Sequence, residues 1–299
     1  MVRRTRSSLR SPRARAVGQA IRQAREDAGI GVRELARRLS VGHAWVGRVE
    51  RAEVLLTPDL VAAIAGALEL APADRESLVD QTRNLAAGSP WTPSSDLPGQ
   101  LATLISYEQE AMRIADVATV IPGLLQTRAY ARAVLASADG PYAPADLVIT
   151  RMGRQSILNE PPAPDYTAYI DESALMRPVG GARVMTDQLT RLISHPTATV
   201  RIIPITLAPT PDLVPGSLGT FALIEFTDAP PVVYLEHLAT GTYLDRPSDT
   251  GTYVRAVDTL SGVAMTPDES AKVIATYRDR YEGQDQRDTD AQGVEKIQP

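Results

Sequence analysis

Several arginines lie within residues 33–52, at a spacing that suits binding to a polyanion. The segment reads RELARRLSVGHAWVGRVERA, with one histidine and one tryptophan between the arginines. Guanidinium groups bind phosphate through charge-assisted hydrogen bonds, and one arginine can donate two hydrogen bonds to a guanine base. The segment therefore suits contact with a nucleic acid. Its candidate contact residues are Arg33, Arg37, Arg38, His43, Trp45, Arg48 and Arg51.

These candidates divide into two roles, because phosphate contacts supply affinity whereas base contacts supply specificity. We expect phosphate contacts from the other arginines of the segment and from six more within residues 1–15, which predicts binding that weakens steeply with salt. Base reading falls to His43, Trp45 and Arg48, of which Arg48 suits a bidentate contact with guanine. Two roles stay open for each aromatic residue. His43 contacts the groove or caps a helix, and Trp45 contacts a base or packs in the core.

Five short helices are predicted around this segment, and together they make an all-α domain over residues 15–86. The helices are placed by apolar periodicity and by Gly or Pro at their boundaries. The first ends at Gly29, the second and third cover about 32–39 and 43–51, the fourth begins after Thr57, and the fifth begins near Pro72. The second and third helices are joined by a turn of three residues. Such a pair suits a first helix that braces across the DNA backbone and a second that enters the major groove.

The motif residues of this pair can be matched to a known pattern. They are Glu34-Leu35-Ala36, Leu39, Val41, Val46 and Arg48-Val49-Glu50-Arg51. In this register, residues 17–85 resemble the phage-repressor-type helix-turn-helix domain of the xenobiotic-response-element family. The resemblance implies a DNA-binding domain.

The chain also departs from that pattern at several positions. Where the family usually has polar residues or glycine, this chain has Val32, Ser40, Gly42, His43, Ala44, Gly47 and Ala52. Glycine and alanine offer no side-chain donor to a base. We therefore expect docking on DNA with a short set of base contacts, and a homodimer that doubles this set on paired half-sites.

Charge is distributed unevenly along the chain. Residues 1–51 hold 13 arginines against four acids, a net +9, which leaves −14 for the remaining residues of a chain whose overall charge is −5. A basic head on an acidic body is the layout expected when only the head meets a polyanion. The alternative is a disordered basic tail beside a solvated helix face.

Composition excludes several classes of site. The absence of cysteine excludes disulfides, thiolate metal sites and a cysteine nucleophile. No two of the three histidines share a helix face at metal-ligand spacing, so we expect neither a metal nor a cofactor. No apolar run is long enough for a membrane span, and no apolar signal core follows the N-terminus, so we expect a cytoplasmic protein.

The rest of the chain is predicted to be a mixed α+β domain over residues 100–282. A linker at 87–99 precedes it, and disordered segments are expected at 1–14 and 283–299. The predicted helices are 100–117, a segment after the Pro-Gly turn at 122–123, 144–158, the segment GGARVMTDQLTRLISHP at 180–196, 248–261 and 267–281. The predicted strands are the segments DYTAYI, TVRIIPI, GTFALIEF, PVVYLEHL and GTYLD.

The order of motifs in this domain resembles that of an antitoxin-like domain, which follows the helix-turn-helix in many actinobacterial regulators. The motifs include TVIPGLLQTRAYARAVL, YIDESALMRPVGG and SGVAMTPDESAKVI. The resemblance implies a transcriptional regulator, often with a small protein partner. An apolar ligand pocket is also expected near the strands, because tyrosines combine apolar faces with hydroxyl groups. The candidate residues, which alternatively fill the core, are Tyr166, Tyr169, Tyr234 and Tyr243.

Potentially catalytic residues in this domain have simpler explanations. Asp171 and Glu172 lie where a strand meets a helix N-terminus, and His195 lies at a helix end. His237 follows Glu236, and neighbours in a strand point to opposite faces. We therefore expect no enzyme, but a regulator whose C-terminal domain senses a small molecule or binds a protein partner. The alternative is a regulator fold recruited as a biosynthetic enzyme, with decayed DNA contacts.

Overall fold

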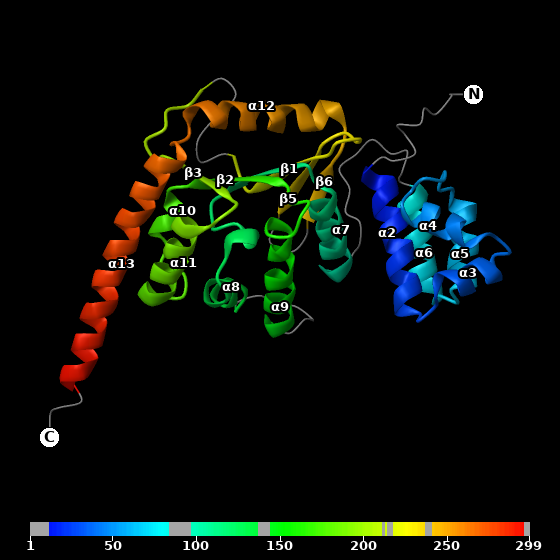
Figure 1. The fold of residues 1–299 in the computed structure, drawn as a ribbon, viewed down its shortest axis with the longest axis horizontal. Coiled ribbons are helices and arrows are strands. Elements are labelled where there is room, and N and C mark those ends of the chain that lie inside the picture. Colours follow the sequence, from blue (N-terminus) through cyan, green and yellow to red (C-terminus); the bar gives the residue numbers. More distant parts are fainter. Residues whose placement is uncertain are drawn as a thin grey trace. The chain divides into compact units, whose positions relative to one another are not determined.

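The computed structural model describes residues 12–83, 97–136, 144–210, 213, 218–236 and 241–295 (Figure 1). The chain divides into two compact units, residues 1–112 with 223–251 and residues 113–222 with 252–299. An N-terminal helical region is followed by a mixed α+β region, which confirms the predicted fold class.

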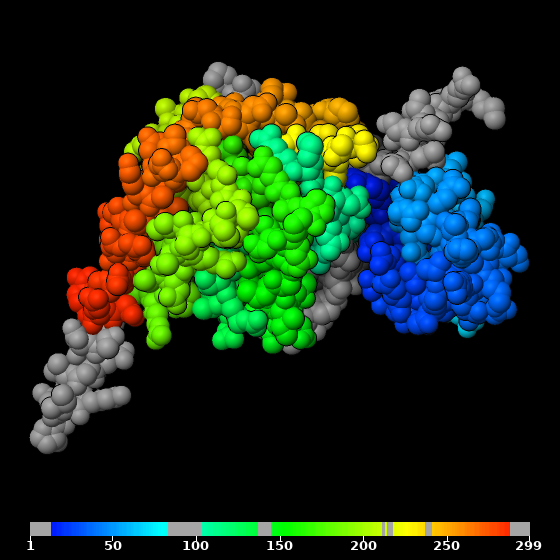
Figure 2. Space-filling view, viewed as in Figure 1, coloured from blue at the N-terminus to red at the C-terminus, as the bar shows by residue number. Residues whose placement is uncertain are grey.

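Five helices form the N-terminal region, as predicted. They are α2 (Pro12–Asp27), α3 (Val32–Arg38), α4 (His43–Glu50), α5 (Pro58–Ala67) and α6 (Pro72–Arg83). They make one close-packed body, dark to light blue in Figure 2. Their apolar faces share a core that includes Ile21, Leu35, Val46, Val49 and Ile64, each at most 1% exposed. The predicted cap of α5 is confirmed, because Thr57 Oγ1 accepts a hydrogen bond from the Leu60 amide at 3.3 Å.

Two departures from the helix-turn-helix pattern leave its backbone unchanged. Ser40 and Ala52, at positions where glycine is usual, have φ values of 55° and 53°. Each follows a helix end closed by a pair of backbone hydrogen bonds, such as Val41 N to Ala36 O at 2.9 Å and Glu53 N to Arg48 O at 2.8 Å. The turns thus keep the left-handed conformation that glycine favours, at a cost of about 1–2 kcal/mol for each residue with a Cβ atom.

The rest of the first unit consists mainly of one helix and three strands. These are α7 (Leu97–Glu110), β4 (Phe221–Glu225), β5 (Val232–Glu236) and β6 (Gly241–Leu244), with β4 belonging to this unit from Leu223 onward. Strands β5 and β6 pair in an antiparallel hairpin, in which Tyr234 lies opposite Tyr243. The strand order of the whole six-stranded sheet is β3-β2-β1-β4-β5-β6.

The second unit contains the three parallel strands. They are β1 (Arg113–Ala118), β2 (Asp165–Asp171) and β3 (Thr199–Ile203), in the register Val117 to Tyr169 and Tyr169 to Arg201. Its helices are η2 (Gly123–Leu125), α8 (Arg128–Leu135), α9 (Pro144–Arg154), η3 (Gln155–Leu158), α10 (Ser173–Met176), α11 (Ala182–Ser194), α12 (Pro247–Val263) and α13 (Pro267–Glu295).

Buried glutamines fix the segment that carries the Pro-Gly turn. Gln126 Nε2 donates to the Ile121 carbonyl at 2.7 Å, and Gln155 Nε2 donates to the carbonyls of Gly123 and Gln126 at 3.0 and 2.8 Å. Gln188, which is fully buried, donates to the Leu125 carbonyl at 2.9 Å. Buried amides that are satisfied in this way hold an irregular segment in one conformation.

Three predicted boundaries are corrected. The helix predicted at 100–117 ends at Glu110, and residues 113–118 form β1. Both faces of this strand are buried, so its sequence lacks the polar-apolar alternation that identifies a half-exposed strand. The final helix continues to Glu295, so most of the segment 283–299 that we expected to be disordered is helical. At the other end, α2 already begins at Pro12, whereas residues 1–11 lie outside the described residues.

Candidate nucleic-acid interface

The core of the domain fixes how α3 and α4 cross. Leu35 from α3 and Val46 and Val49 from α4 are each 1% exposed, and Ala36 is 4% exposed. The opposite side of the pair carries exposed residues, which include Arg33 on α3 and His43 and Arg48 on α4. The arrangement is that of a helix-turn-helix, with one helix to brace and a second to present side chains to a groove.

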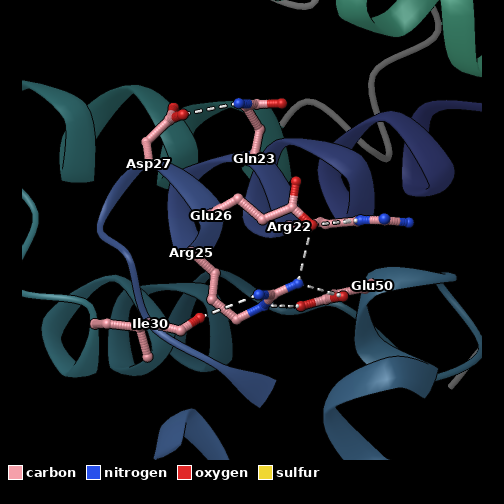
Figure 3. Close-up of polar contacts among 7 residues, drawn as sticks. All are labelled: Arg22, Gln23, Arg25, Glu26, Asp27, Ile30 and Glu50. Atoms are coloured by element: carbon pink, nitrogen blue, oxygen red, sulfur yellow. Dashed lines mark hydrogen bonds and ion pairs between the residues drawn. The ribbon is translucent and has the colours of Figure 1, made fainter.

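A buried ion pair ties the end of α4 to α2 (Figure 3). Arg25 Nε donates to Glu50 Oε1 at 2.6 Å, and Arg25 Nη2 lies 3.3 Å from Glu50 Oε2. The guanidinium also donates to the Ile30 carbonyl at 3.0 Å. Both side chains are less than 10% exposed, and the bond to Glu50 is the main cause that raises the pKa of Arg25. This pair was not predicted from the sequence. The sequence feature that could have indicated it is the position of Arg25, four residues after Ile21 and therefore on the apolar face of α2.

Gly18 lets α2 approach the backbone of α4 closely. A methyl group at this position would overlap the Glu50 carbonyl oxygen and lie 3.1 Å from the Val49 carbonyl oxygen. The crossing of α2 and α4 therefore depends on a missing side chain and on the Arg25–Glu50 pair. Together they orient the helix that carries Arg48.

The motif arginines differ in whether they already have partners. Arg37 and Arg38 both bind Glu34, at 2.7 and 3.0 Å, and Arg51 binds Glu53 at 3.2 Å. Arg33 and Arg48 are exposed and form no ion pair within the described part of the chain. Of the described arginines predicted to contact DNA, these two have a charge that no neighbouring acid offsets.

Glu34 is held in its ionised form by its two partners. Hydrogen bonds from Arg37 and then Arg38 lower the pKa of this carboxyl group to about 2. Glu34 also raises the pKa of Arg37, mainly through the same hydrogen bond. The face of α3 that carries Arg37 and Arg38 thus also carries a negative charge.

The structure also places the two aromatic candidates of α4. The helix cap is Gly42, which makes no side-chain cap bond, so His43 is the first helical residue and lies exposed. Trp45 is partly buried and packs against the domain core. Gly47 leaves room for the Arg51 guanidinium, whose Nη1 would lie 3.1 Å from a Cβ atom at that position. The exposed side-chain donors of α4 are therefore His43 and Arg48.

Two arginines of the predicted basic arm point into the protein instead. Arg13 Nε donates to Asp245 Oδ2 at 2.9 Å, and their side chains are 6% and 9% exposed. Arg15 pairs with Glu110, and its guanidinium lies 4.1 Å from the centre of the Phe226 ring. All these residues belong to the first unit. Because both charges are already partnered, the expectation that Arg13 and Arg15 contact phosphate is wrong.

The four candidate ligand-binding tyrosines do not form one lining. Tyr166 and Tyr169 are three residues apart on β2, so they point to opposite faces of the sheet. Tyr166 donates to Asp116 Oδ2 at 2.6 Å, whereas the Tyr234 and Tyr243 rings contact one another at 4.9 Å in the β5–β6 hairpin. Three of the four are at most 2% exposed, and Tyr234 is partly exposed. This agrees with the alternative that such tyrosines fill the core.

The residues that resembled catalytic groups have structural partners. Asp171 Oδ1 accepts the Ser173 amide at 2.9 Å, and Glu172 accepts the Ile205 amide and the Tyr277 hydroxyl, both at 3.0 Å.

Of the histidines in the C-terminal region, one can be described. Nδ1 of His195 accepts the Ala198 amide at 3.2 Å, and burial, helped by Arg191, lowers the pKa of this histidine. His237 lies outside the described residues. Within the described ranges, no cluster of three or more potential ligands could hold a metal ion, and no helix there is long and apolar enough to cross a membrane.

Comparison with known families agrees with this geometry. The family model described as a helix-turn-helix domain matches residues 16–78, so the chain carries a DNA-binding domain of the kind found in regulators. A second model, described as Domain of unknown function (DUF5753), matches residues 101–276, which is more than half of the chain. The protein therefore belongs to the DUF5753 family. Neither a curated protein nor a solved structure matches it.

Proposed function

We propose that this protein is a transcriptional regulator that docks α4 in the major groove of double-stranded DNA. The proposal is carried by two exposed arginines, Arg33 and Arg48, which have no ion-pair partner among the described residues and lie on a helix pair whose crossing is fixed by buried residues. Fixed helices present a donor in one orientation, which base reading requires. A protein that acts on the chromosome in this way works in the cytoplasm of a bacterial cell.

The two arginines have different roles in this proposal. Arg33 lies in the first turn of α3, the bracing helix, so it binds phosphate. Arg48 lies on α4 and reads guanine, with His43 as a further groove contact. Arg48→Ala should therefore cost about 1–3 kcal/mol at one base-pair position, whereas Arg33→Ala should weaken binding to all sequences alike.

The test is binding of the full chain to its own promoter and to a scrambled duplex, across a series of salt concentrations. Arg75→Ala is the matched control, because Arg75 is exposed on α6, outside the helix pair. The proposal predicts that this variant binds like the wild type. It fails if the wild type binds neither duplex at low salt. If Arg48→Ala instead weakens both duplexes equally, the protein binds DNA but reads it elsewhere.

A homodimer completes the proposed binding mode. One recognition helix with two exposed donors gives little specificity, whereas two copies on half-sites about one helical turn apart double the base contacts. Sedimentation at micromolar concentration should therefore show a species of twice the 32.2 kDa chain mass. A monomer both with and without promoter DNA would contradict this part of the proposal.

The DUF5753 region, in this proposal, senses a small molecule or binds a protein partner and does not catalyse a reaction. Support comes from Asp171, Glu172 and His195, whose polar atoms hold backbone turns and a tyrosine. The order of its motifs favours the antitoxin-like, partner-binding form. Native mass spectrometry of the protein purified from its own host should show a bound molecule or protein that alters promoter binding. Chemical turnover of a bound compound would instead favour a recruited enzyme.

A further inference from the structure

We propose that Glu34, and Glu53 in the same way, are internal counter-ions that occupy phosphate-binding arginines and thereby limit the affinity of the protein for DNA. The proposal rests on the DNA-binding function proposed above. It goes beyond that function because it assigns an opposing role to two acids at the interface.

Glu34 is well placed to imitate a phosphate group. Its two carboxylate oxygens accept hydrogen bonds from Arg37 Nη2 at 2.7 Å and Arg37 Nε at 2.9 Å, which is the side-by-side geometry that a guanidinium forms with phosphate. Arg38 Nε adds a third bond at 3.0 Å. The spacing of three and four residues on one helix places all three side chains on the same face.

The two partners of Glu34 differ in whether they can exchange it for DNA. Arg38 also donates to the Ala67 carbonyl at 2.8 Å and to Glu69 at 3.0 Å, so it braces α3 against the end of α5. The Arg37 side chain is 74% exposed, and its only acceptor within the described residues is Glu34. Arg37 is therefore the residue that can turn from the carboxylate to a phosphate.

A second pair follows the same plan at the end of α4. Arg51 donates from Nε and Nη2 to the two carboxylate oxygens of Glu53, at 3.3 and 3.2 Å. The Arg51 side chain is 63% exposed. Gly47 gives its guanidinium room to lie along the helix. An exposed arginine held by a neighbouring acid thus lies on α3, at Arg37, and directly after α4, at Arg51.

These two ion pairs can open because both are exposed to solvent. An exposed ion pair contributes about 0–1 kcal/mol, so exchange of its carboxylate for a phosphate costs little. The Arg25–Glu50 pair, in contrast, is buried, and breaking it is expensive. After the exchange, however, the free carboxylate remains close to the DNA and repels it.

The salt dependence follows from the same charges. Binding releases counter-ions in proportion to the phosphates that the protein neutralises, and a carboxylate beside an arginine cancels part of that effect. The slope of affinity against salt should therefore be shallower than the number of motif arginines suggests. This revises the steep dependence expected from the sequence.

The experiment compares Glu34→Gln with the wild type on promoter DNA. Glutamine keeps an acceptor for the arginines but removes the charge. The variant should bind about three- to tenfold more tightly at low salt, with a log–log salt slope steeper by about 0.9. It should consequently lose about 3.5-fold more affinity than the wild type between 50 and 200 mM salt. In an Arg37→Ala background the gain should shrink.

The control is Glu76→Gln, which makes the same change of charge at an exposed position of α6. Its affinity should stay within twofold of the wild type. If Glu34→Gln and Glu76→Gln behave alike, the inference is overturned while the proposed function stands. If the wild type and Glu34→Gln both bind no duplex at low salt, both fail.

Discussion

Removal of Glu50 should weaken the helix-turn-helix domain strongly, because it leaves a buried guanidinium without its main partner. In the folded protein Arg25 makes two contacts with Glu50, at 2.6 and 3.3 Å. The Glu50→Ala variant loses both contacts and the buried negative charge. The contacts that remain are the Ile30 carbonyl at 3.0 Å and the exposed Glu26 at 3.3 Å.

These contacts set the size of the effect. Breaking a buried ion pair by removing one partner costs about 3–5 kcal/mol, since the other charge stays buried and unpaired. The bonds to Ile30 and Glu26 keep part of the guanidinium satisfied, so we expect about 3 kcal/mol, at the lower end of this range. Replacing both residues, as in Arg25→Met with Glu50→Leu, removes the unpaired charge and should restore most of the stability.

Urea unfolding followed by tryptophan fluorescence measures this loss. Trp45 lies on α4 and packs against the domain core, and a Trp91→Phe background makes it the single tryptophan of the chain. With a urea dependence of about 2 kcal/mol per molar, the midpoint for Glu50→Ala should fall by about 1.5 M. A fall of less than about 0.5 M, or a double variant no more stable than the single one, would refute the reasoning.

Three further changes test other parts of the structure. Gly18→Ala should destabilise the domain by about 1–3 kcal/mol in the same assay, because the new methyl group overlaps the Glu50 carbonyl oxygen. Ser40→Gly should stabilise it by about 0.5–1 kcal/mol, since glycine relieves the positive φ of an exposed residue but adds freedom to the unfolded chain. Lowering the pH should destabilise the second unit, because the folded pKa of His195 lies below its unfolded value. The contribution of His195 to the stability of the folded unit is complete above about pH 6.5, and it is lost as the pH falls toward the folded pKa. Thermal unfolding measured against pH should show that this pH dependence disappears in His195→Asn.

The sequence predicted the N-terminal domain well because its signals are local. Apolar residues repeat with helical spacing, and caps such as Thr57-Pro58 mark where a helix begins. The short strands of the C-terminal region were found where β-branched and aromatic residues lie between turn residues. Strand β1 was missed because Ile114, Ala115, Val117 and Ala118 are all buried, and such a segment also fits a helix.

The candidate site was predicted less well, because a count of charges does not show which charges are already paired. The +9 charge of residues 1–51 indicated a surface open to DNA, but most of its described arginines bind acids of the same chain. The Glu34 pairs could have been predicted, since acids and arginines three and four residues apart on a helix are neighbours. The Arg13–Asp245 pair could not, because 232 positions separate the two residues and only the fold brings them together. Arginines that have an acid three or four residues away on the same helix can thus be set aside before a DNA-binding surface is assigned to a basic sequence. In α3 and α4, the arginines that then remain are Arg33 and Arg48.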